Sequence, residues 1–241
     1  MRHLFLLAAL FCACISYAQI RVQERLPKSK TGFALTTAKT RAKIYYDVND
    51  ALVIKRSAEL FARDIQMVTG QKPELIPKRE RAKALVIVGT IEKNQWICEL
   101  AQKGKIDIRP LQGAWERYLI QTVDNPSPGV AKALVIAGSD RRGAAYGLFS
   151  ISEMMGVSPW YWWGDVPAKT HKALYVDAPP TYSKTPSVKY RGIFLNDEDW
   201  GLKPWAAKTF EKERGNIGPR TYAKICELLP VSYTHLRAHE T

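Results

Sequence analysis

The feature that most limits the fold of this chain is a regular alternation of short apolar runs and longer segments with helical periodicity. The short runs, which are typical of β-strands, are residues 43–46, 85–88, 118–123 and 133–137. The helical segments, whose ends carry cap and glycine signals, are residues 51–69, 94–104 and 141–155. Because a helix and a sheet each bury one side against another layer, this order predicts a mixed-sheet α/β domain. We place that domain at residues 28–178 and expect residues 173–176 to be its closing edge strand.

A second unit follows a proline-rich linker at residues 179–187. The apolar and aromatic run at residues 190–195 predicts a buried strand, and residues 221–229 predict a helix. One strand and one helix are the first unit of a (β/α)8 barrel, which needs about eight such units and on the order of 250 residues. We therefore expect residues 188–229 to be the start of a barrel that this chain truncates.

The two ends of the chain have their own signals. Residues 1–18 combine a basic start, an apolar stretch and small residues, which is typical of a secretory signal peptide. Residues 230–241 interrupt the preceding helix and are predicted to be a non-native tail. We therefore expect an exported protein, periplasmic or extracellular, that has no membrane association after the signal is cleaved.

Charge and residue counts narrow the possible chemistry. The net charge of +13 suits a polyanionic partner, but no nucleic-acid motif is present, so an acidic polysaccharide is the better expectation. Most of the basic residues are spread along the chain, as on a solvated surface. Outside the predicted signal and tail only His171 remains, which is too little for a metal cluster, and no cofactor is expected. Cys98 and Cys226 are predicted to be separate core residues rather than a disulfide.

Two glycine-bearing turns follow predicted buried strands, at residues 86–90 and 135–143. Neither has the spacing of a dinucleotide-binding or phosphate-binding loop. We predict a tight turn in which Asp140 lies near a helix start, where an acid suits the helix dipole. Arg142 is a candidate ligand for a sugar carboxylate, and the alternative is that it only covers the domain surface.

An aromatic loop at residues 158–167 contains Trp160, Tyr161, Trp162 and Trp163 between prolines. Flat aromatic rings suit the faces of sugars, so Trp162 and Trp163 are candidate substrate-binding residues. The alternative is an interdomain wedge, in which the same rings seal one domain against the next. The sequence leaves both interpretations open.

Three blocks of sequence, in this order, make the chain recognisable. They are SPWYWWGDVP at residues 158–167, YRGIFLNDEDWGLKPWA at residues 190–206 and GNIGPRTYAKICELL at residues 215–229. Together they resemble the amino-terminal part of glycoside hydrolase family 115, the xylan α-glucuronidases. The resemblance implies removal of glucuronic acid or its 4-O-methyl ether from xylan side chains with inversion, glucuronoxylan or a related acidic plant polysaccharide as partner, and a homodimer as an option for the full-length parent.

The acids at the end of the predicted barrel strand carry the catalytic prediction. Barrel enzymes place catalytic groups at the carboxyl ends of strands, so Asp197, Glu198 and Asp199 are the candidate catalytic residues. Side chains alternate along a strand, and the unknown register leaves the choice among the three open. Asn196 is a candidate hydrogen-bond donor to sugar hydroxyls and Trp200 a candidate platform. An acidic turn that merely ends a strand is the alternative.

Inversion needs an acid and a base whose carboxyl groups lie about 6.5 to 9.5 Å apart. Neighbouring residues of one loop are poorly placed for both roles, so the second group is expected on a later strand outside this chain. We therefore expect this chain by itself to be inactive. The rival interpretations are a carbohydrate-binding or scaffold module that uses residues 160–163 without catalysis, and a glycosidase of the hexosaminidase type, against which the NDEDW block argues.

Overall fold

A six-stranded mixed sheet forms the centre of the computed structural model, which describes residues 19–195, 199–232 and 235–236. Its strands are β3 (Lys43–Tyr46), β4 (Leu75–Ile76), β5 (Ala82–Thr90), β6 (Tyr118–Ser127), β7 (Val130–Gly138) and β9 (Thr181–Tyr182). Their spatial order is β4, β3, β5, β7, β6, β9. The first four are parallel to one another, whereas β6 runs antiparallel to β7 and β9. The predicted mixed α/β fold is therefore confirmed.

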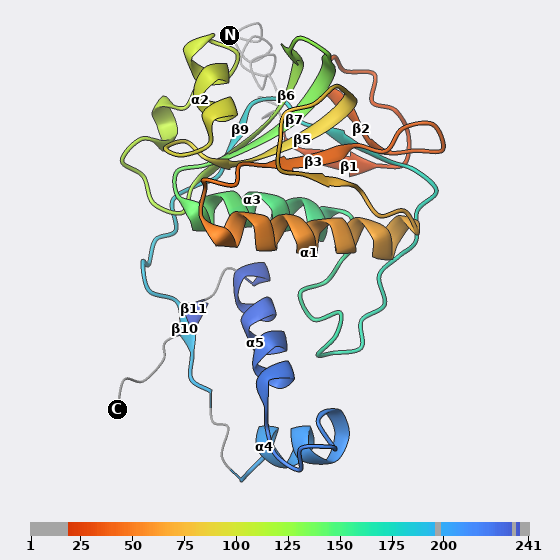
Figure 1. The fold of residues 1–241 in the computed structure, drawn as a ribbon, viewed down its shortest axis with the longest axis vertical. Coiled ribbons are helices and arrows are strands. Elements are labelled where there is room, and N and C mark those ends of the chain that lie inside the picture. The colour runs from red at the N-terminus through yellow and green to blue at the C-terminus, as the bar shows by residue number, and fades with distance from the viewer. Residues whose placement is uncertain (1–18, 196–198, 233–234, 237–241) are drawn as a thin grey trace, which may run out of the picture.

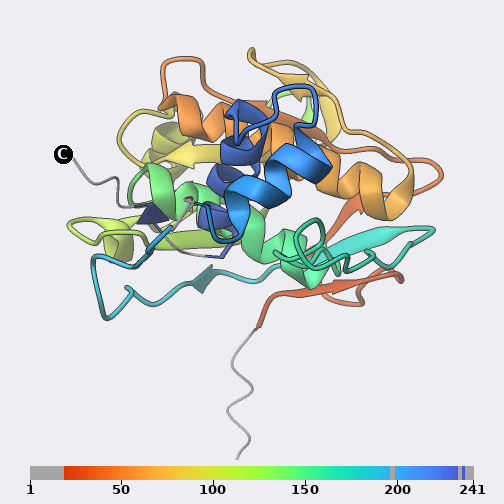
Figure 2. The same cartoon turned by 90° about the horizontal axis from the view of Figure 1, so that it is seen from below.

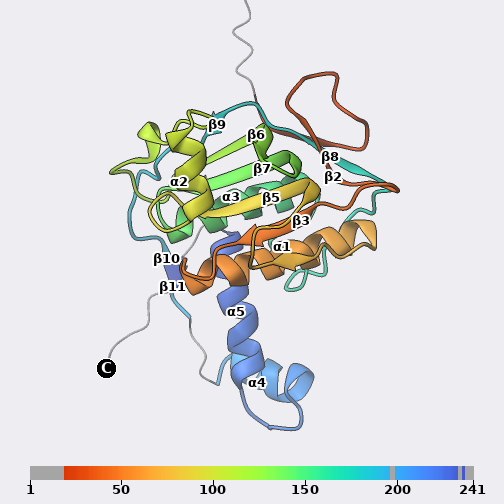
Figure 3. The ribbon, with the colours of Figure 1, turned by 45° about the horizontal axis from the view of Figure 1, so that its top comes forward.

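Three helices cover both faces of this sheet (Figures 1 and 3). They are α1 (Leu52–Thr69), α2 (Gln95–Gln102) and α3 (Arg141–Met154). Alternate side chains of β5 face opposite layers: Val86 and Val88 belong to the core with α1 and α3, whereas Leu85 and Ile87 belong to the core with α2. A central strand that is covered on both faces needs apolar residues at every position, which explains the unbroken run at residues 85–88.

The hairpin of β6 and β7 is longer than the apolar pattern predicts. The predicted strand ends at residue 123, but β6 continues to Ser127 and pairs there with Val130. Gly129 has a φ of 84°, a left-handed conformation that suits glycine. The prediction ended too early because it followed apolar residues, whereas backbone pairing continues through polar ones to the turn.

A second sheet of three antiparallel strands lies beside the first. It consists of β1 (Arg21–Gln23), β8 (Leu174–Asp177) and β2 (Gly32–Thr36), with β8 in the middle. The expected closing edge strand at residues 173–176 is therefore wrong, because β8 has a partner on each side. A short alternating run looks the same at an edge and in the centre of a sheet.

Two strands of these two sheets fall outside the predicted bounds of the α/β domain, residues 28–178. One is β1, which precedes these bounds, and the other is β9, which lies within the predicted linker and pairs with β6. Strands of two or three residues carry no periodic signal. The division of the chain into domains otherwise stays a prediction.

The carboxyl-terminal segment forms a strand–helix–strand unit. It contains β10 (Gly192–Ile193), α4 (Leu202–Trp205), a π-helical turn (Ala206–Phe210), α5 (Pro219–Val231) and β11 (His235–Leu236). The strands β10 and β11 pair in parallel, and α5 lies against α1 and α3 on the side away from the sheet (Figures 1 and 2). The predicted helix at residues 221–229 is confirmed. The predicted tail, residues 230–241, includes β11.

The expected burial of the strand at residues 190–195 is wrong. β10 has two residues, and Tyr190 and Phe194 are each 78% exposed. Among the described residues, β11 is the strand that pairs with β10, and no described layer covers it. Apolar composition permits burial of a strand but does not supply the layer that buries it.

Glu211 holds the start of α5. Its Oε2 accepts hydrogen bonds from the backbone N of Gly218 (3.0 Å) and Thr221 (2.9 Å) and from the Thr221 hydroxyl (2.6 Å). Burial raises the pKa of Glu211, but the hydrogen bonds from Thr221 and its neighbours outweigh burial, so the pKa lies below its usual value. A carboxylate at this place satisfies backbone donors that a helix start leaves without partners.

Several predictions concern residues outside the described ranges. The signal peptide at residues 1–18 and the candidate site residues Asn196, Asp197 and Glu198 lie there. Within the described ranges, no helix has both the length and the apolar character needed to cross a bilayer.

Candidate functional site

The acid loop after β10 is described only from Asp199 onward. Asp199 is exposed, and its Oδ1 lies 2.9 Å from the Nζ of Lys203 in α4. Trp200 is 89% exposed. Exposed ion pairs of this kind contribute at most about 1 kcal/mol. The described end of the loop therefore presents an accessible carboxylate and an accessible indole ring.

Trp162 and Trp163 belong to an aromatic cluster with Trp205 and Phe210. The ring centroids of Trp162 lie 4.7 Å from those of Trp163 and 4.9 Å from those of Phe210, and Trp163 lies 5.7 Å from Trp205. The contacts of Trp162 with Trp163, Trp205 and Phe210 are all edge-to-face, an arrangement that the charge distribution of aromatic rings favours. The cluster joins the aromatic loop to the segment between α4 and α5.

A pocket of about 700 Å³ lies against this cluster. Trp162 and Trp163 line it together with Asp165 of the same loop and Gly201, which directly follows Trp200. Its volume falls within the usual range for sites that bind small molecules. The structure thus brings the aromatic loop and the end of the acid loop to one pocket, although they are far apart in sequence.

Tyr161 packs between the α/β domain and α5. Its hydroxyl donates to Oε1 of Glu227 (2.7 Å) and accepts from Nζ of Lys224 (3.1 Å). The guanidinium of Arg63 in α1 lies 5.1 Å from the ring centroid, and its Nη1 lies 2.8 Å from Glu227 Oε1. Tyr161 therefore ties the α/β domain to α5, and it lines the pocket together with Trp162 and Trp163. The sugar-binding interpretation of the loop stays a prediction beside the observed interdomain contact.

Burial, hydrogen bonds and neighbouring charges shift the pKa values of the ionisable groups around Tyr161. Burial, followed by the hydrogen bond to Glu227, raises the pKa of the Tyr161 hydroxyl. Burial also raises the pKa of Glu227, but the bond from Tyr161 and the charges of Arg63 and Lys224 outweigh it, so this pKa lies below its ordinary value of 4.5. For Asp64, next to Arg63, burial is the larger effect and raises the pKa. The contact between α1 and α5 is thus held by an ionised glutamate.

We expect Glu227→Gln to reduce stability on the order of 1 kcal/mol at about pH 7, and this difference to shrink as the pH falls below about 4.5. A carboxylate whose folded pKa is lowered stabilises the fold above its unfolded pKa, about 4.5, and the stabilisation is lost as the pH falls through the folded pKa. Urea unfolding of both proteins at several pH values measures the difference. A difference that is equal at neutral and acid pH would contradict the prediction.

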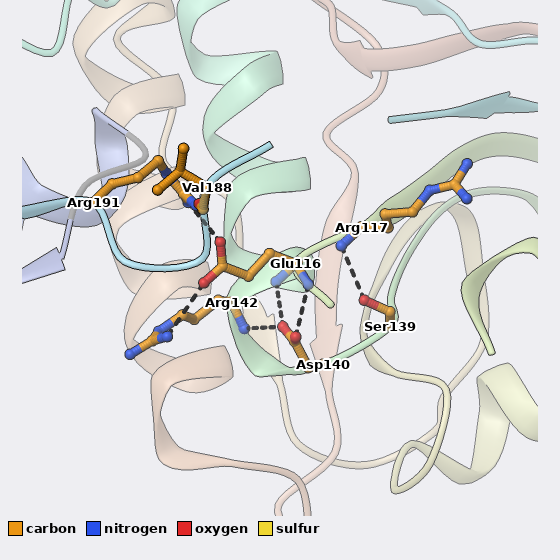
Figure 4. Close-up of polar contacts among 8 residues, drawn as sticks. Glu116, Arg117, Ser139, Asp140, Arg142, Val188 and Arg191 are labelled. Atoms are coloured by element: carbon orange, nitrogen blue, oxygen red, sulfur yellow. Dashed lines mark hydrogen bonds and ion pairs between the residues drawn. The ribbon is translucent and has the colours of Figure 1, made fainter. Parts of the chain in front are cut away.

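Arg142 contacts Glu116, a buried carboxylate that the sequence analysis did not single out (Figure 4). The Glu116 side chain is 3% exposed, with Oε1 3.2 Å from Arg142 Nη1 and Oε2 2.5 Å from Arg191 Nη2. Arg191 directly precedes β10, and its Nη1 donates to the carbonyl of Val188 (2.6 Å). Arg142 is therefore engaged within the protein, and Glu116 ties the α/β domain to the strand that leads into the acid loop.

Asp140 fixes this arrangement from the backbone side. Its Oδ1 accepts from the backbone N of Arg142 (2.9 Å) and Gly143 (2.8 Å), and its Oδ2 accepts from the backbone N of Glu116 (2.7 Å). The predicted tight turn with Asp140 at the helix start is confirmed. Glycine is needed at position 143 because a Cβ there would lie 2.1 Å from the carbonyl oxygen of Arg117.

Nothing in the sequence around Glu116 sets it apart. Its φ is 55°, which is uncommon for a residue with a side chain. Its second partner, Arg191, lies 75 residues away. A contact of that sequence separation has no local pattern, so only the folded structure reveals it.

Comparisons with known proteins bear on both parts of the chain. The family model described as Glycosyl hydrolase family 115 matches residues 183–230, which include the acid loop and most of α5. The solved structure of BtGH115A, described as a family GH115 4-O-methyl-alpha-glucuronidase with specificity for decorated arabinogalactans, is 35% identical with a TM-score of 0.69. That match covers 84% of this chain and 25% of BtGH115A, so the chain spans a quarter of that protein's length.

Two further solved structures have low identity. CpGH84D is 12% identical with a TM-score of 0.44, covering 90% of this chain and 35% of its own. The GH20 beta-N-acetylhexosaminidase from Streptomyces coelicolor A3(2) is 13% identical with a TM-score of 0.37, covering 73% of this chain and 26% of its own. Among curated proteins, none matched the chain.

The family match and the structural match agree. The first falls on the segment that carries β10, α4 and α5, and the second extends over most of the α/β domain as well. The chain therefore belongs to glycosyl hydrolase family 115.

Proposed function

We propose that the longer protein to which this chain corresponds in part removes glucuronic acid, or its 4-O-methyl ether, from the side chains of a decorated plant polysaccharide, with glucuronoxylan as the expected substrate. The observation that carries the proposal is the 35% identity, over 84% of this chain, with a protein described as a 4-O-methyl-alpha-glucuronidase. Export to the periplasm or the exterior belongs to the same proposal and rests on the signal-like pattern of residues 1–18.

The proposed mechanism is inverting hydrolysis. One carboxylic acid protonates the leaving oxygen while a second carboxylate activates water on the opposite face of the sugar. One of Asp197, Glu198 and Asp199 supplies one of these groups or positions the substrate, with Asn196 and Trp200 contacting the sugar. Support comes from the parallel pairing of β10 and β11 across α4 and α5, because this is the connection that a (β/α) barrel repeats.

The second carboxylate is proposed to lie on a later strand of the barrel. Asp199 is one of three adjacent acids in one loop, and neighbours so close together cannot flank a sugar at about 6.5 to 9.5 Å. This chain alone is therefore proposed to be inactive. Arg142 is not proposed as a main ligand of the sugar carboxylate, because its guanidinium already pairs with Glu116.

The test is release of uronic acid by the longer protein from glucuronoxylan and, in parallel, from a glucuronic-acid-decorated arabinogalactan. We expect release from glucuronoxylan, with the β anomer as the first product seen by NMR because hydrolysis of an α-linkage with inversion gives it. The 241-residue chain, assayed in parallel, should release none.

Each other outcome corrects a stated part of the proposal. Release from the arabinogalactan alone would make that polysaccharide the substrate in place of glucuronoxylan. An α anomer as first product would refute inversion. Release by the 241-residue chain would refute its inactivity. No release from either polysaccharide by the longer protein would overturn the proposed function.

A second candidate function is a carbohydrate-binding or scaffold module without catalysis. The pocket of about 700 Å³ lined by Trp162 and Trp163 favours it, because aromatic rings beside an open pocket suit sugar faces. Binding of xylan by this chain should then survive the change of Asp197, Glu198 and Asp199 to their amides. It should be lost when Trp162 and Trp163 are changed to alanine.

A further inference from the structure

A groove of about 780 Å³ lies where the start of β5, the end of α2 and the β6–β7 turn meet. It is called the basic groove here, and its charged lining residues are Arg81, Lys83, Lys103 and Lys105. None of the described residues that line it is acidic; the remaining ones are Ala82 and residues 125–131. We propose that the basic groove binds the carboxylates of an acidic polysaccharide chain.

The cations of the groove form few contacts with acids. In the described part of the chain, no carboxylate forms an ion pair with Arg81, Lys83 or Lys103. Glu80 pairs with Lys43, and Asp124 pairs with Lys132 at 3.1 Å. Glu99 pairs with Arg79 at 2.7 Å, and the charge of Lys103 adds a smaller effect that lowers the pKa of Glu99. Clustered like charges repel one another and attract an anion that relieves the repulsion.

Hydrogen bonds to backbone carbonyl groups hold the walls of the groove in place. The Nζ of Lys105 donates to the carbonyl oxygens of Asp124 (3.4 Å) and Asn125, which fastens the β6–β7 turn to the end of α2. Ala82 N donates to the Gly129 carbonyl (3.0 Å), which fastens the same turn to β5. Lys105 thus shapes the groove, while Arg81, Lys83 and Lys103 form no ion pair in the described part of the chain and can meet a ligand.

The lining indicates which polyanion fits. Proteins that bind single-stranded nucleic acid combine basic grooves with aromatic rings on which bases stack, and no aromatic residue lines this groove. The groove can recognise a ligand by its charge, which suits a polymer that carries carboxylates at intervals along its length. Such chains are polysaccharides with uronic acid residues, and membership of a glycosyl hydrolase family makes a polysaccharide the natural partner.

The basic groove is distant from the pocket beside the acid loop. In Figure 1 the β6–β7 turn lies at the top of the molecule and α4 lies at the bottom. A long polysaccharide held at the groove would stay at high local concentration near the protein without occupying that pocket. The inference needs only the α/β domain and does not depend on the proposed hydrolysis.

The test measures binding of polygalacturonate, glucuronoxylan and a xylan without uronic acid to the 241-residue chain by calorimetry at low salt. One variant combines Arg81→Gln, Lys83→Gln and Lys103→Gln. The matched control combines Lys28→Gln, Lys30→Gln and Lys172→Gln, which removes the same charge from exposed positions outside the groove. We expect both acidic polymers to bind about tenfold more weakly to the groove variant and to be unaffected by the control.

Circular dichroism and thermal unfolding establish that both variants are folded. Equal loss in the two variants would overturn the proposal, because net charge would then be the cause. Equal binding of the xylan without uronic acid would also overturn it. Tighter binding of single-stranded DNA than of polygalacturonate would assign the groove to nucleic acid instead. Absence of hydrolysis by the longer protein would overturn the proposed function and leave this result unchanged.

Discussion

Glu116→Gln should destabilise the chain by about 2 to 3 kcal/mol. The Glu116 carboxylate is buried between Arg142 and Arg191, and neutralising it leaves two guanidinium groups without their counter-charge. Removal of one partner from a buried pair commonly costs about 3 to 5 kcal/mol, and the partial exposure of both arginines reduces this value. Urea unfolding of the variant and the parent chain measures the loss.

A double-mutant cycle with Arg191→Gln locates the effect. If Glu116 acts mainly through Arg191, the two single variants should lose similar stability and the double variant should lose less than their sum. Hydrogen exchange should also become faster in residues 188–195, which Arg191 holds against the α/β domain. The control is Glu59→Gln, whose carboxylate pairs with Arg56 on the exposed surface of α1 and should cost less than about 0.5 kcal/mol. A Glu116→Gln loss no larger than this control would refute the prediction.

Gly143→Ala should cost about 3 kcal/mol. A Cβ at this position would lie 2.1 Å from the carbonyl oxygen of Arg117, far inside any normal contact. That oxygen cannot retreat freely, since it accepts from the backbone N of Ser139 (2.8 Å) while Arg117 N donates to the Ser139 hydroxyl (2.9 Å). The gain of about 1 kcal/mol that alanine brings inside a helix is smaller than the cost of the overlap.

Gly201→Ala is the matched control for this prediction. No described atom lies within 4 Å of a Cβ placed at Gly201, so alanine meets no overlap there of the kind expected at Gly143. Its effect on the free energy of unfolding should stay within about 0.5 kcal/mol. A Gly143→Ala cost below about 1 kcal/mol would show that the turn before α3 can open, and would contradict the close packing of α3 on β6.

The parts of the fold that follow from the sequence are those with a repeating pattern. The helix α1 was predicted within a residue of its bounds because its apolar positions recur at helical spacing and Gly70, with a φ of 71°, ends it. The strand β5 was predicted because it is apolar on both faces. By contrast, β1, β4 and β9 have two or three residues each, and only their pairing partners define them.

For the candidate site, local chemistry could be predicted and long-range contacts could not. The role of Asp140 follows from a short polar side chain directly before a helix. The link from Tyr161 to Glu227 spans 66 residues, and that from Glu116 to Arg191 spans 75. Neither pairing can be inferred from the local sequence, because the two partners are far apart along the chain. The aromatic loop is ambiguous for the same reason, since its sequence does not reveal which segment its rings contact.

The placement of α5 has a consequence for the order in which the protein is built. A ribosome releases the amino-terminal part of a chain first, and domains commonly fold as they emerge. All strands of the six-stranded sheet and both α1 and α3 precede residue 183, so they can be complete before α5 is synthesised. When α5 emerges, Arg63 and Tyr161 already form a surface ready to receive Glu227. The helix α5, the first helix of the proposed barrel, can therefore pack on an α/β domain that is already folded. This packing does not depend on the barrel strands that follow it.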